Sequence, residues 1–168
     1  GLGDGPWGEQ MLYACLAAGK PLLIDADALN LLAVEPIALP NGSVITPHPG
    51  EAARLLDRHS VEVQEDRFAA AKGLQDKLQA AVVLKGNGTL VADSLGIGVC
   101  LAGNPGMASG GMGDVLSGVI GSFLAQGLNA RSAARLGVVL HATAADNAAA
   151  VRGMAGLLAS DVIEELGW

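Results

Sequence analysis

Aromatic residues are scarce in this sequence, because Phe, Trp and Tyr make up only 3% of its 168 residues. Hydrophobic residues reach 51%, so a sizeable core is available, but it has to consist of Ala, Leu, Val and Ile. Cysteine is scarcer still. Cys15 and Cys100 provide neither a disulfide framework nor the spacing of a metal site, and their apolar neighbours predict two small buried hydrophobic residues.

Positive charge is also in short supply. Lys and Arg number 10 against 17 Asp and Glu, which gives a net charge of −7 and a pI near 4.7. This balance argues against binding to nucleic acid or to an anionic membrane surface. The uncharged run at 115–130 is shorter than the ~20 apolar residues of a membrane span. Nothing at the N-terminus resembles a targeting segment, so we expect a soluble, cytoplasmic protein.

Short apolar runs alternate with stretches of helical periodicity along the chain. Strands are predicted at Pro21–Asp25, Ser43–Pro47, Ala81–Gly86, Thr89–Asp93 and Ile97–Ala102. Helices are predicted from Gly50 onward and at Met11–Ala18, Ala26–Ala33, Val63–Ala80, Gly113–Gln126, Ala130–Val151 and Ser160–Leu166. Asn87–Gly88 indicates a tight hairpin. This order predicts one α/β domain of three layers, with a mainly parallel central sheet flanked by helices.

The stretch GNPGMASGGMGDVLSGVIG, residues 103–121, places a glycine-rich loop between a predicted strand and a predicted helix. The unpaired N–H groups of such a helix start bind anions, and glycine lets a phosphate approach them closely. The spacing fits no dinucleotide-binding fingerprint, and it fits no P-loop because Met112 stands where Lys is required. Asp114 leaves two interpretations open. It is either a base that takes a proton from a hydroxyl attacking phosphate, or a carboxylate that only complements the helix dipole.

Four segments in order resemble the ADP- or ATP-dependent NAD(P)H-hydrate dehydratase family of the ribokinase-like superfamily. They are DADALNLLA (25–33), TPHPGEAARLL (46–56), LKGNGT (84–89) and NPGMASGGMGDVLSG (104–118). The resemblance covers most of the chain and implies a ribokinase-like fold. Domains of this family have further strands and helices upstream, so residues 1–168 are expected to form the C-terminal part of a single domain whose N-terminal part is missing.

The resemblance implies two segments that contact the adenine nucleotide. Both are rich in glycine, which exposes backbone N–H groups to phosphate. The implied residues are Lys85, Gly86, Asn87, Gly88, Thr89, Asn104, Pro105, Gly106, Met107, Ala108, Ser109, Gly110, Gly111, Met112 and Gly113.

Substrate contacts are implied at Asp114, which would also be the catalytic base, at His48, and at Gly3, the end of a GLG that resembles a family substrate loop. Asn30 is a further candidate, because it follows a predicted strand, where α/β folds place ligands. Glu51 is implied to order a hydrated Mg²⁺ through water. Vitamin kinases of the superfamily tend to carry Asn where His48 stands, which favours a dehydratase over a kinase.

The implied reaction repairs a hydrated cofactor. ADP or ATP would phosphorylate the C6 hydroxyl of hydrated NADH or NADPH, and the phosphate would then leave. The resemblance implies Mg²⁺ as cofactor, a homo-oligomer (a tetramer), and an NAD(P)H-hydrate epimerase as a fused or separate partner.

Two other functions are compatible with the same residues: a vitamin-type kinase of this fold, and a non-catalytic nucleotide-binding remnant. The Lys85 side chain stays open as a phosphate contact. His141, among Ala and Val in a predicted helix, is predicted to be a core histidine that packs against neighbouring elements.

Overall fold

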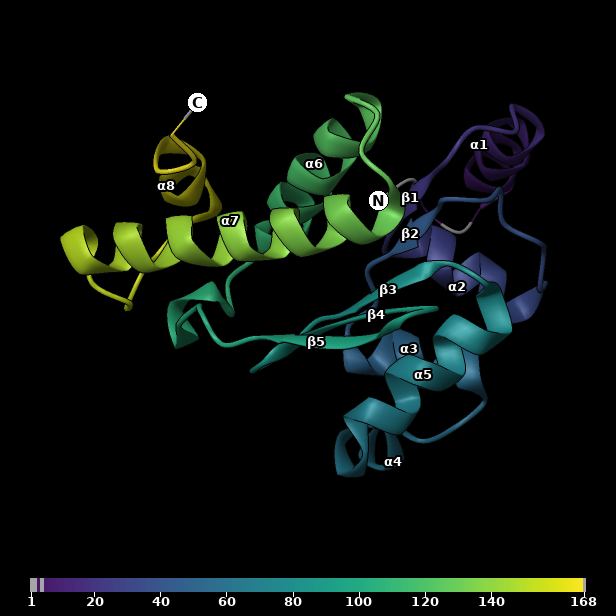
Figure 1. Ribbon diagram of the computed structural model, residues 1–168, viewed down its shortest axis with the longest axis horizontal. Helices are drawn as coiled ribbons and strands as arrows, with labels where there is room; N and C mark the ends of the chain where they lie inside the picture. The colour runs from purple at the N-terminus through teal and green to yellow at the C-terminus, as the bar shows by residue number, and fades with distance from the viewer. Residues whose placement is uncertain (1–2, 4, 168) are drawn as a thin grey trace.

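A five-stranded sheet forms the middle layer of the protein in a computed structural model, which describes residue 3 and residues 5–167 (Figure 1). The strands follow one another across the sheet in chain order: β1 (Leu23–Ile24), β2 (Val44–Ile45), β3 (Ala81–Leu84), β4 (Thr89–Asp93) and β5 (Gly96–Cys100). β1, β2 and β3 run parallel, whereas β4 and β5 continue the sheet as antiparallel hairpins.

Helices cover both faces of this sheet. They are α1 (Pro6–Ala17), α2 (Asp27–Val34), α3 (Pro49–Leu56), α4 (Ser60–Glu65), α5 (Arg67–Leu78), α6 (Met112–Ala125), α7 (Ala130–Arg152) and α8 (Ala159–Glu164), with a short 3₁₀ turn η1 (Pro105–Met107). Figure 1 shows α6, α7 and α8 on one side of the strands and α2 to α5 on the other. The predicted three-layer α/β fold is therefore confirmed.

Alternation along the strands divides the core in two. Val83 and Val91 pack with α6 and α7, whereas Val82, Leu84 and Leu90 pack with the helices of the other face. This division follows from the two-residue period of a strand, which points successive side chains to opposite faces. Alanines on α7 let that helix approach the sheet closely. Close approach fills this part of the core without aromatic side chains, which are scarce in the sequence.

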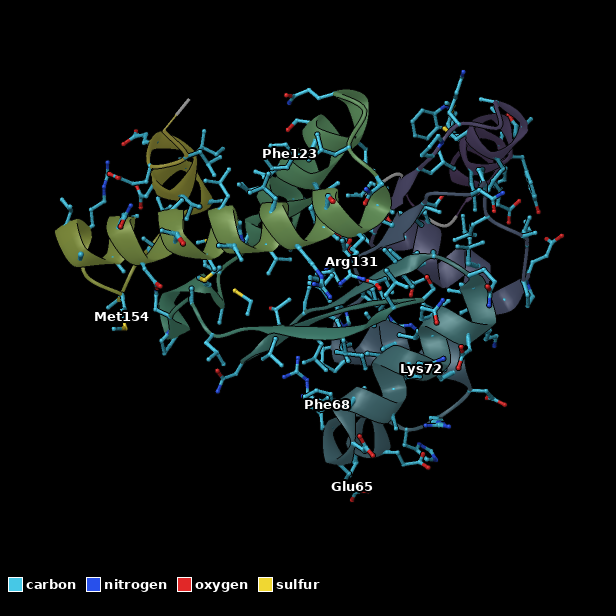
Figure 2. The ribbon with its side chains drawn as sticks, in the orientation of Figure 1. Glu65, Phe68, Lys72, Phe123, Arg131 and Met154 are labelled. Atoms are coloured by element: carbon cyan, nitrogen blue, oxygen red, sulfur yellow. The ribbon has the colours of Figure 1, made fainter. Side chains whose placement is uncertain are left out.

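A partly buried ion pair ties α7 to the sheet. Figure 2 shows Arg131 between α7 and the strands, with its Nη1 3.0 Å from Oδ1 of Asp93 in β4. Arg135, one turn further along α7, places Nη2 3.6 Å from the other oxygen of the same carboxylate. Figure 2 also labels Glu65 of α4 and Phe68 and Lys72 of α5, which lie on the other side of the strands from α7.

Two local expectations were wrong, and a third was only partly right. The helix predicted over Val63–Ala80 is broken at Asp66, whose extended backbone lets its carboxylate accept the N–H of Ala69 and begin α5. Cys15 is exposed because only one face of α1 is covered, whereas Cys100 is buried as expected. The hairpin at Asn87–Gly88 exists, but its connection runs over residues 85–88.

Among the described residues, no helix is both long and apolar enough to cross a membrane.

Candidate active site

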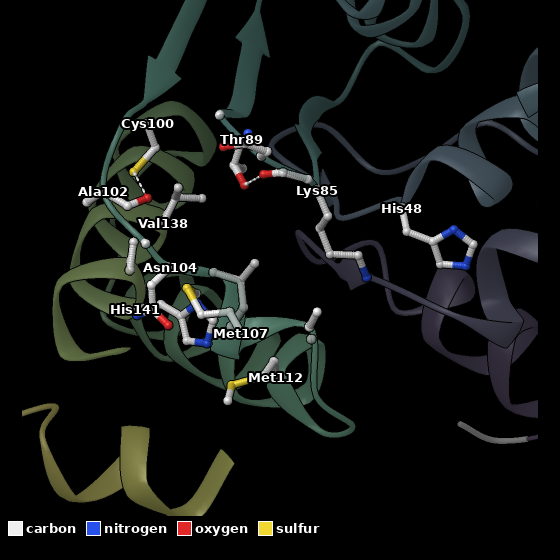
Figure 3. Close-up of a pocket in the computed structure, with 18 of the residues that line it drawn as sticks. His48, Lys85, Thr89, Cys100, Ala102, Asn104, Met107, Met112, Val138 and His141 are labelled. Carbon is white, nitrogen blue, oxygen red and sulfur yellow. Dashed lines mark hydrogen bonds between the residues drawn. The ribbon is translucent and has the colours of Figure 1, made fainter. Parts of the chain in front are cut away.

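A cavity of about 610 Å³ lies where the hairpin strands, the glycine-rich loop and α7 meet. This volume falls within the range of about 300–1,000 Å³ that is usual for small-molecule sites. Figure 3 shows Lys85 and His48 on one side of the cavity and Cys100, Met107 and His141 on the other. The two ends differ in chemistry, because the first is charged and the second is apolar.

Lys85 is the charged centre of the first end. Its Nζ lies 2.8 Å from Oδ1 of Asp25 and 3.9 Å from Oε2 of Glu51. Ser117 of α6 donates to the other oxygen of Asp25 at 3.0 Å. A methyl group on Gly113 would stand 3.4 Å from the Lys85 ammonium. These contacts bring all four segments that carried the family resemblance to one point.

The first turn of α6 opens onto this charged end. Its N-cap, Gly111, has a φ of 83°, a left-handed conformation that suits glycine, and it offers no side chain to cap the helix. The first N–H groups of α6 therefore keep their hydrogen-bonding capacity, and the helix dipole adds partial positive charge. With the ammonium of Lys85 beside Gly113, this end of the cavity is suited to phosphate.

The second end of the cavity is apolar. Its walls come from β5, α6 and α7: Cys100, Ala102, Leu116, Val138 and Ala142. His141 of α7 also lines it and is only 4% exposed. Burial lowers the pKa of His141 to about 4, so its imidazole is neutral near pH 7. Its burial agrees with the predicted core histidine, but its place in the cavity wall was not predicted.

The glycine-rich loop lies between the two ends of the cavity, and Asp146 of α7 fixes its start by hydrogen bonds. Asp146 accepts the N–H of Gly103 at 2.9 Å through Oδ2 and the side-chain amide of Asn104 at 2.9 Å through Oδ1. Asn104 also donates to the carbonyl of Ala145 and accepts the N–H of Gly106. Asp146 was not among the residues predicted from the sequence, where its one signal is an acid in an alanine-rich helix segment.

Arg67 holds the other nucleotide segment. From the first turn of α5, its guanidinium donates to the carbonyls of Leu84, Lys85 and Asn87. Burial lowers the pKa of Arg67 from its ordinary value, which still leaves the group charged at neutral pH. The turn at residues 85–88 is thus fixed by a residue that sequence reasoning missed, because the two lie far apart along the chain.

His48 and Glu51 form a capping box at the start of α3. His48 Nδ1 accepts the N–H groups of Gly50 and Glu51, at 3.0 and 3.3 Å. Glu51 Oε2 in turn accepts the N–H of His48 at 2.7 Å, and Glu51 is only 5% exposed. An accepting Nδ1 leaves the proton on Nε2, which lies 3.4 Å from Glu51 Oε1. His48 lines the cavity, but part of its hydrogen-bonding capacity is used by the helix.

The remaining candidates, Asp114, Asn30 and Gly3, do not line the cavity. Asp114 is exposed in the first turn of α6, next to the cavity-lining Gly113. Asn30 is half-buried and accepts Arg54 Nε at 2.8 Å, while Gly3 donates to Asp27. The first two residues of GLG lie outside the described part of the chain.

Most of the predicted nucleotide residues line the cavity. All five positions of the 85–89 segment do so, as do seven of the glycine-rich loop: Asn104, Pro105, Met107, Ala108, Ser109, Met112 and Gly113. Gly106, Gly110 and Gly111 belong to the same loop but not to the lining. Within the described residues, no group of three or more His, Cys, Asp or Glu side chains could hold a metal ion.

Comparisons with known proteins match this chain to the family that its four motifs resemble. The family model described as NAD(P)H-hydrate dehydratase matches residues 1–167. A bifunctional NAD(P)H-hydrate repair enzyme of Coxiella burnetii is 52% identical over 167 residues, which are 99% of this chain and 34% of that enzyme. An ADP-dependent (S)-NAD(P)H-hydrate dehydratase of Neisseria meningitidis is 44% identical over 177 residues, 100% of this chain and 60% of that enzyme.

A solved structure extends the comparison. The ADP/ATP-dependent NAD(P)H-hydrate dehydratase of Bacillus subtilis, co-crystallized with ATP/Mg²⁺, matches with a TM-score of 0.87 at 31% identity. The match covers 99% of this chain and 60% of that one. The chain thus spans about a third of the bifunctional relative and about three fifths of the other two proteins.

Proposed function

Because the chain belongs to the NAD(P)H-hydrate dehydratase family, as its motifs predicted, we propose that it repairs hydrated NADH or NADPH with ADP or ATP as co-substrate. One observation supports this most directly. Residues of three of the four family segments line a single cavity, and the fourth segment reaches it through Asp25, which contacts the cavity-lining Lys85 beside Gly113 and Glu51. The phosphates would lie at this charged end, and the hydrated nicotinamide ring at the mouth beside His48 and Asp114.

Asp114 would act as the base. Its exposed carboxylate stands on the residue after Gly113, so a substrate at the mouth could meet both the carboxylate and the terminal phosphoryl group. As the C6 hydroxyl oxygen attacks phosphorus, its proton passes to Asp114 and the bond to the nucleotide leaving group breaks. Backbone N–H groups of Ser109–Gly113, with Lys85, would stabilise the charge that develops on the transferring group.

Phosphate is then the leaving group of an elimination. The C6–O bond breaks with the assistance of the ring nitrogen's lone pair, and loss of a proton from C5 restores the reduced nicotinamide. Mg²⁺ neutralises phosphate charge when it is bound to the nucleotide. Both oxygens of Glu51 already face His48, so Glu51 would hold Mg²⁺ only through water.

The assay that tests this proposal uses hydrated NADH or NADPH. The protein is incubated with the hydrate and either ADP or ATP, and recovery of the reduced-nicotinamide absorbance is followed. We expect recovery that requires a nucleotide. A vitamin-type kinase would consume nucleotide with an alcohol substrate but leave the hydrate unchanged, and a non-catalytic remnant would bind nucleotide without turnover. Assembly into a homo-tetramer and cooperation with an epimerase stay predictions.

Asp114→Asn tests the base. We expect turnover to fall by about 10²–10⁴-fold while nucleotide affinity is retained, because the amide keeps the shape but accepts no proton. Asp76→Asn is the matched control, since Asp76 is an exposed carboxylate on α5 that pairs with Lys72 and does not line the cavity. Equal turnover in the Asp114 variant and the control would contradict the assignment.

A further inference from the structure

The apolar end of the cavity has no charged side chain, but it contains one polar group, the imidazole of His141. Its walls from β5, α6 and α7 carry no Lys, Arg, Asp or Glu among the described residues that line it. A nucleotide has one polyanionic end and one flat heteroaromatic end. Because Lys85 and the start of α6 lie at the other end, a bound nucleotide would place its base here.

Most polar side chains near this end already have partners. Thr89 Oγ1 donates to the carbonyl of Gly86 at 3.1 Å. The amide of Asn104 is used on both sides, by Asp146 and Ala145 as acceptors and by Gly106 as donor. A ligand reaching this end therefore finds the hydroxyl proton of Thr89 and the side-chain amide of Asn104 already in use.

His141 is the exception. Its Nε2 is buried and has no hydrogen-bond partner among the described residues, although the side chain lines the cavity. Figure 3 shows the imidazole close to Asn104 and Met107 in projection, on the side of the cavity away from Lys85. A buried polar atom without a partner is destabilising by about 1–3 kcal/mol, so a ligand that lets this nitrogen of a cavity-lining side chain form a hydrogen bond would remove that cost.

Building on the nucleotide cavity of the proposed function, we propose that His141 recognises the adenine base through a hydrogen bond at Nε2. A neutral imidazole can donate or accept at this atom, and the base presents both kinds of group along its edge. The apolar walls exclude water, which makes this bond the main polar selector for the base. His141 is thus a specificity-determining residue, separate from the groups that contact phosphate.

Binding measurements on the full chain test this proposal. Affinities for ADP, adenosine and inorganic pyrophosphate are measured by calorimetry for the wild type and for His141→Phe, which keeps a buried ring but no nitrogen. We expect ADP and adenosine to bind about 3–10-fold more weakly to the variant, and pyrophosphate to bind equally to both. Val139→Ala is the control, since Val139 lies on α7 but is exposed and does not line the cavity.

A ligand-side series keeps the test decisive if His141→Phe folds poorly. Adenosine analogues that replace one ring nitrogen by carbon, at position 1, 3 or 7, are titrated into the wild type and into His141→Gln. We expect one analogue to bind weakly to the wild type, and its deficit to change in the variant, because only coupled groups are non-additive. Additive effects for every analogue would overturn the proposal, and so would unchanged adenosine binding to a folded His141→Phe. If the protein turns over the hydrate but shows no such coupling, only the role of His141 is refuted and the dehydratase assignment stands. Coupling without turnover refutes the dehydratase assignment instead.

Discussion

The ammonium of Lys85 lies 2.8 Å from Oδ1 of Asp25, although 60 residues separate the two along the chain. β1 and β3 are not neighbours in the sheet, since β2 lies between them, and the contact spans their carboxyl ends. Ser117 holds the second oxygen of Asp25, so the carboxylate aims Lys85 toward the first turn of α6. The carboxyl ends of parallel strands are where α/β proteins bind ligands.

Lys85→Met should weaken nucleotide binding through the phosphates. A hydrogen bond to a charged group contributes about 1.5–3 kcal/mol, so ADP affinity should fall by about 10–100-fold and adenosine affinity should not change. Calorimetric titration of both ligands is the measurement. Lys72→Met is the control, because Lys72 is an exposed lysine that pairs with Asp76 and does not line the cavity. An equal loss for adenosine would mean that Lys85 supports the fold rather than the phosphates.

Asp146→Ala should loosen the glycine-rich loop. The variant loses two hydrogen bonds, to Gly103 and Asn104, of about 0.5–1.5 kcal/mol each. Because we propose that the loop contacts the nucleotide and not the hydrate, KM for ADP should rise severalfold while KM for the hydrate stays constant. Steady-state kinetics with each substrate varied in turn provide this split. Asn147→Ala, at an exposed neighbouring position of α7, should change neither constant.

Two glycines of the α6–α7 pair should respond in opposite ways to alanine. A Cβ on Gly137 would stand 2.5 Å from Cγ1 and 3.3 Å from Cα of Ile120, so Gly137→Ala should lower the free energy of unfolding by about 1–3 kcal/mol. Gly118 lies in α6 with nothing within 4 Å of such a Cβ, so Gly118→Ala should raise it by about 0.5–1 kcal/mol. Urea denaturation measures both, and a stabilised Gly137→Ala would contradict the close packing of these helices.

The folding free energy should depend on pH through His141. Its pKa is lowered from 6.5 in the unfolded chain to about 4 in the fold, so the unfolded state binds the proton first as pH falls. The native protein should therefore lose stability between pH 6.5 and pH 4, by about 3 kcal/mol from this group. Denaturation at pH 7 and pH 5 checks the sign, and His141→Phe should show a smaller loss than the wild type.

The sequence predicted the parts of this site that depend on local pattern. Alternating strands and helices, the hairpin turn and the glycine-rich start of α6 were all readable from residue order. Groups supplied by distant elements were not, as Asp146 and Arg67 show, because nothing near them in sequence marks what they hold. His141 was predicted to be buried for packing, and only the fold shows that its side chain lines a cavity while its Nε2 has no partner.

The fate of one oxygen atom tests the central claim most directly. Hydrated NADH carrying oxygen-18 in the C6 hydroxyl is turned over with ADP, and the label is located by mass spectrometry. Phosphorylation followed by elimination carries that oxygen into inorganic phosphate, which is the result we predict. Label released into water instead would contradict phosphoryl transfer to the hydroxyl, and with it the role proposed for Asp114.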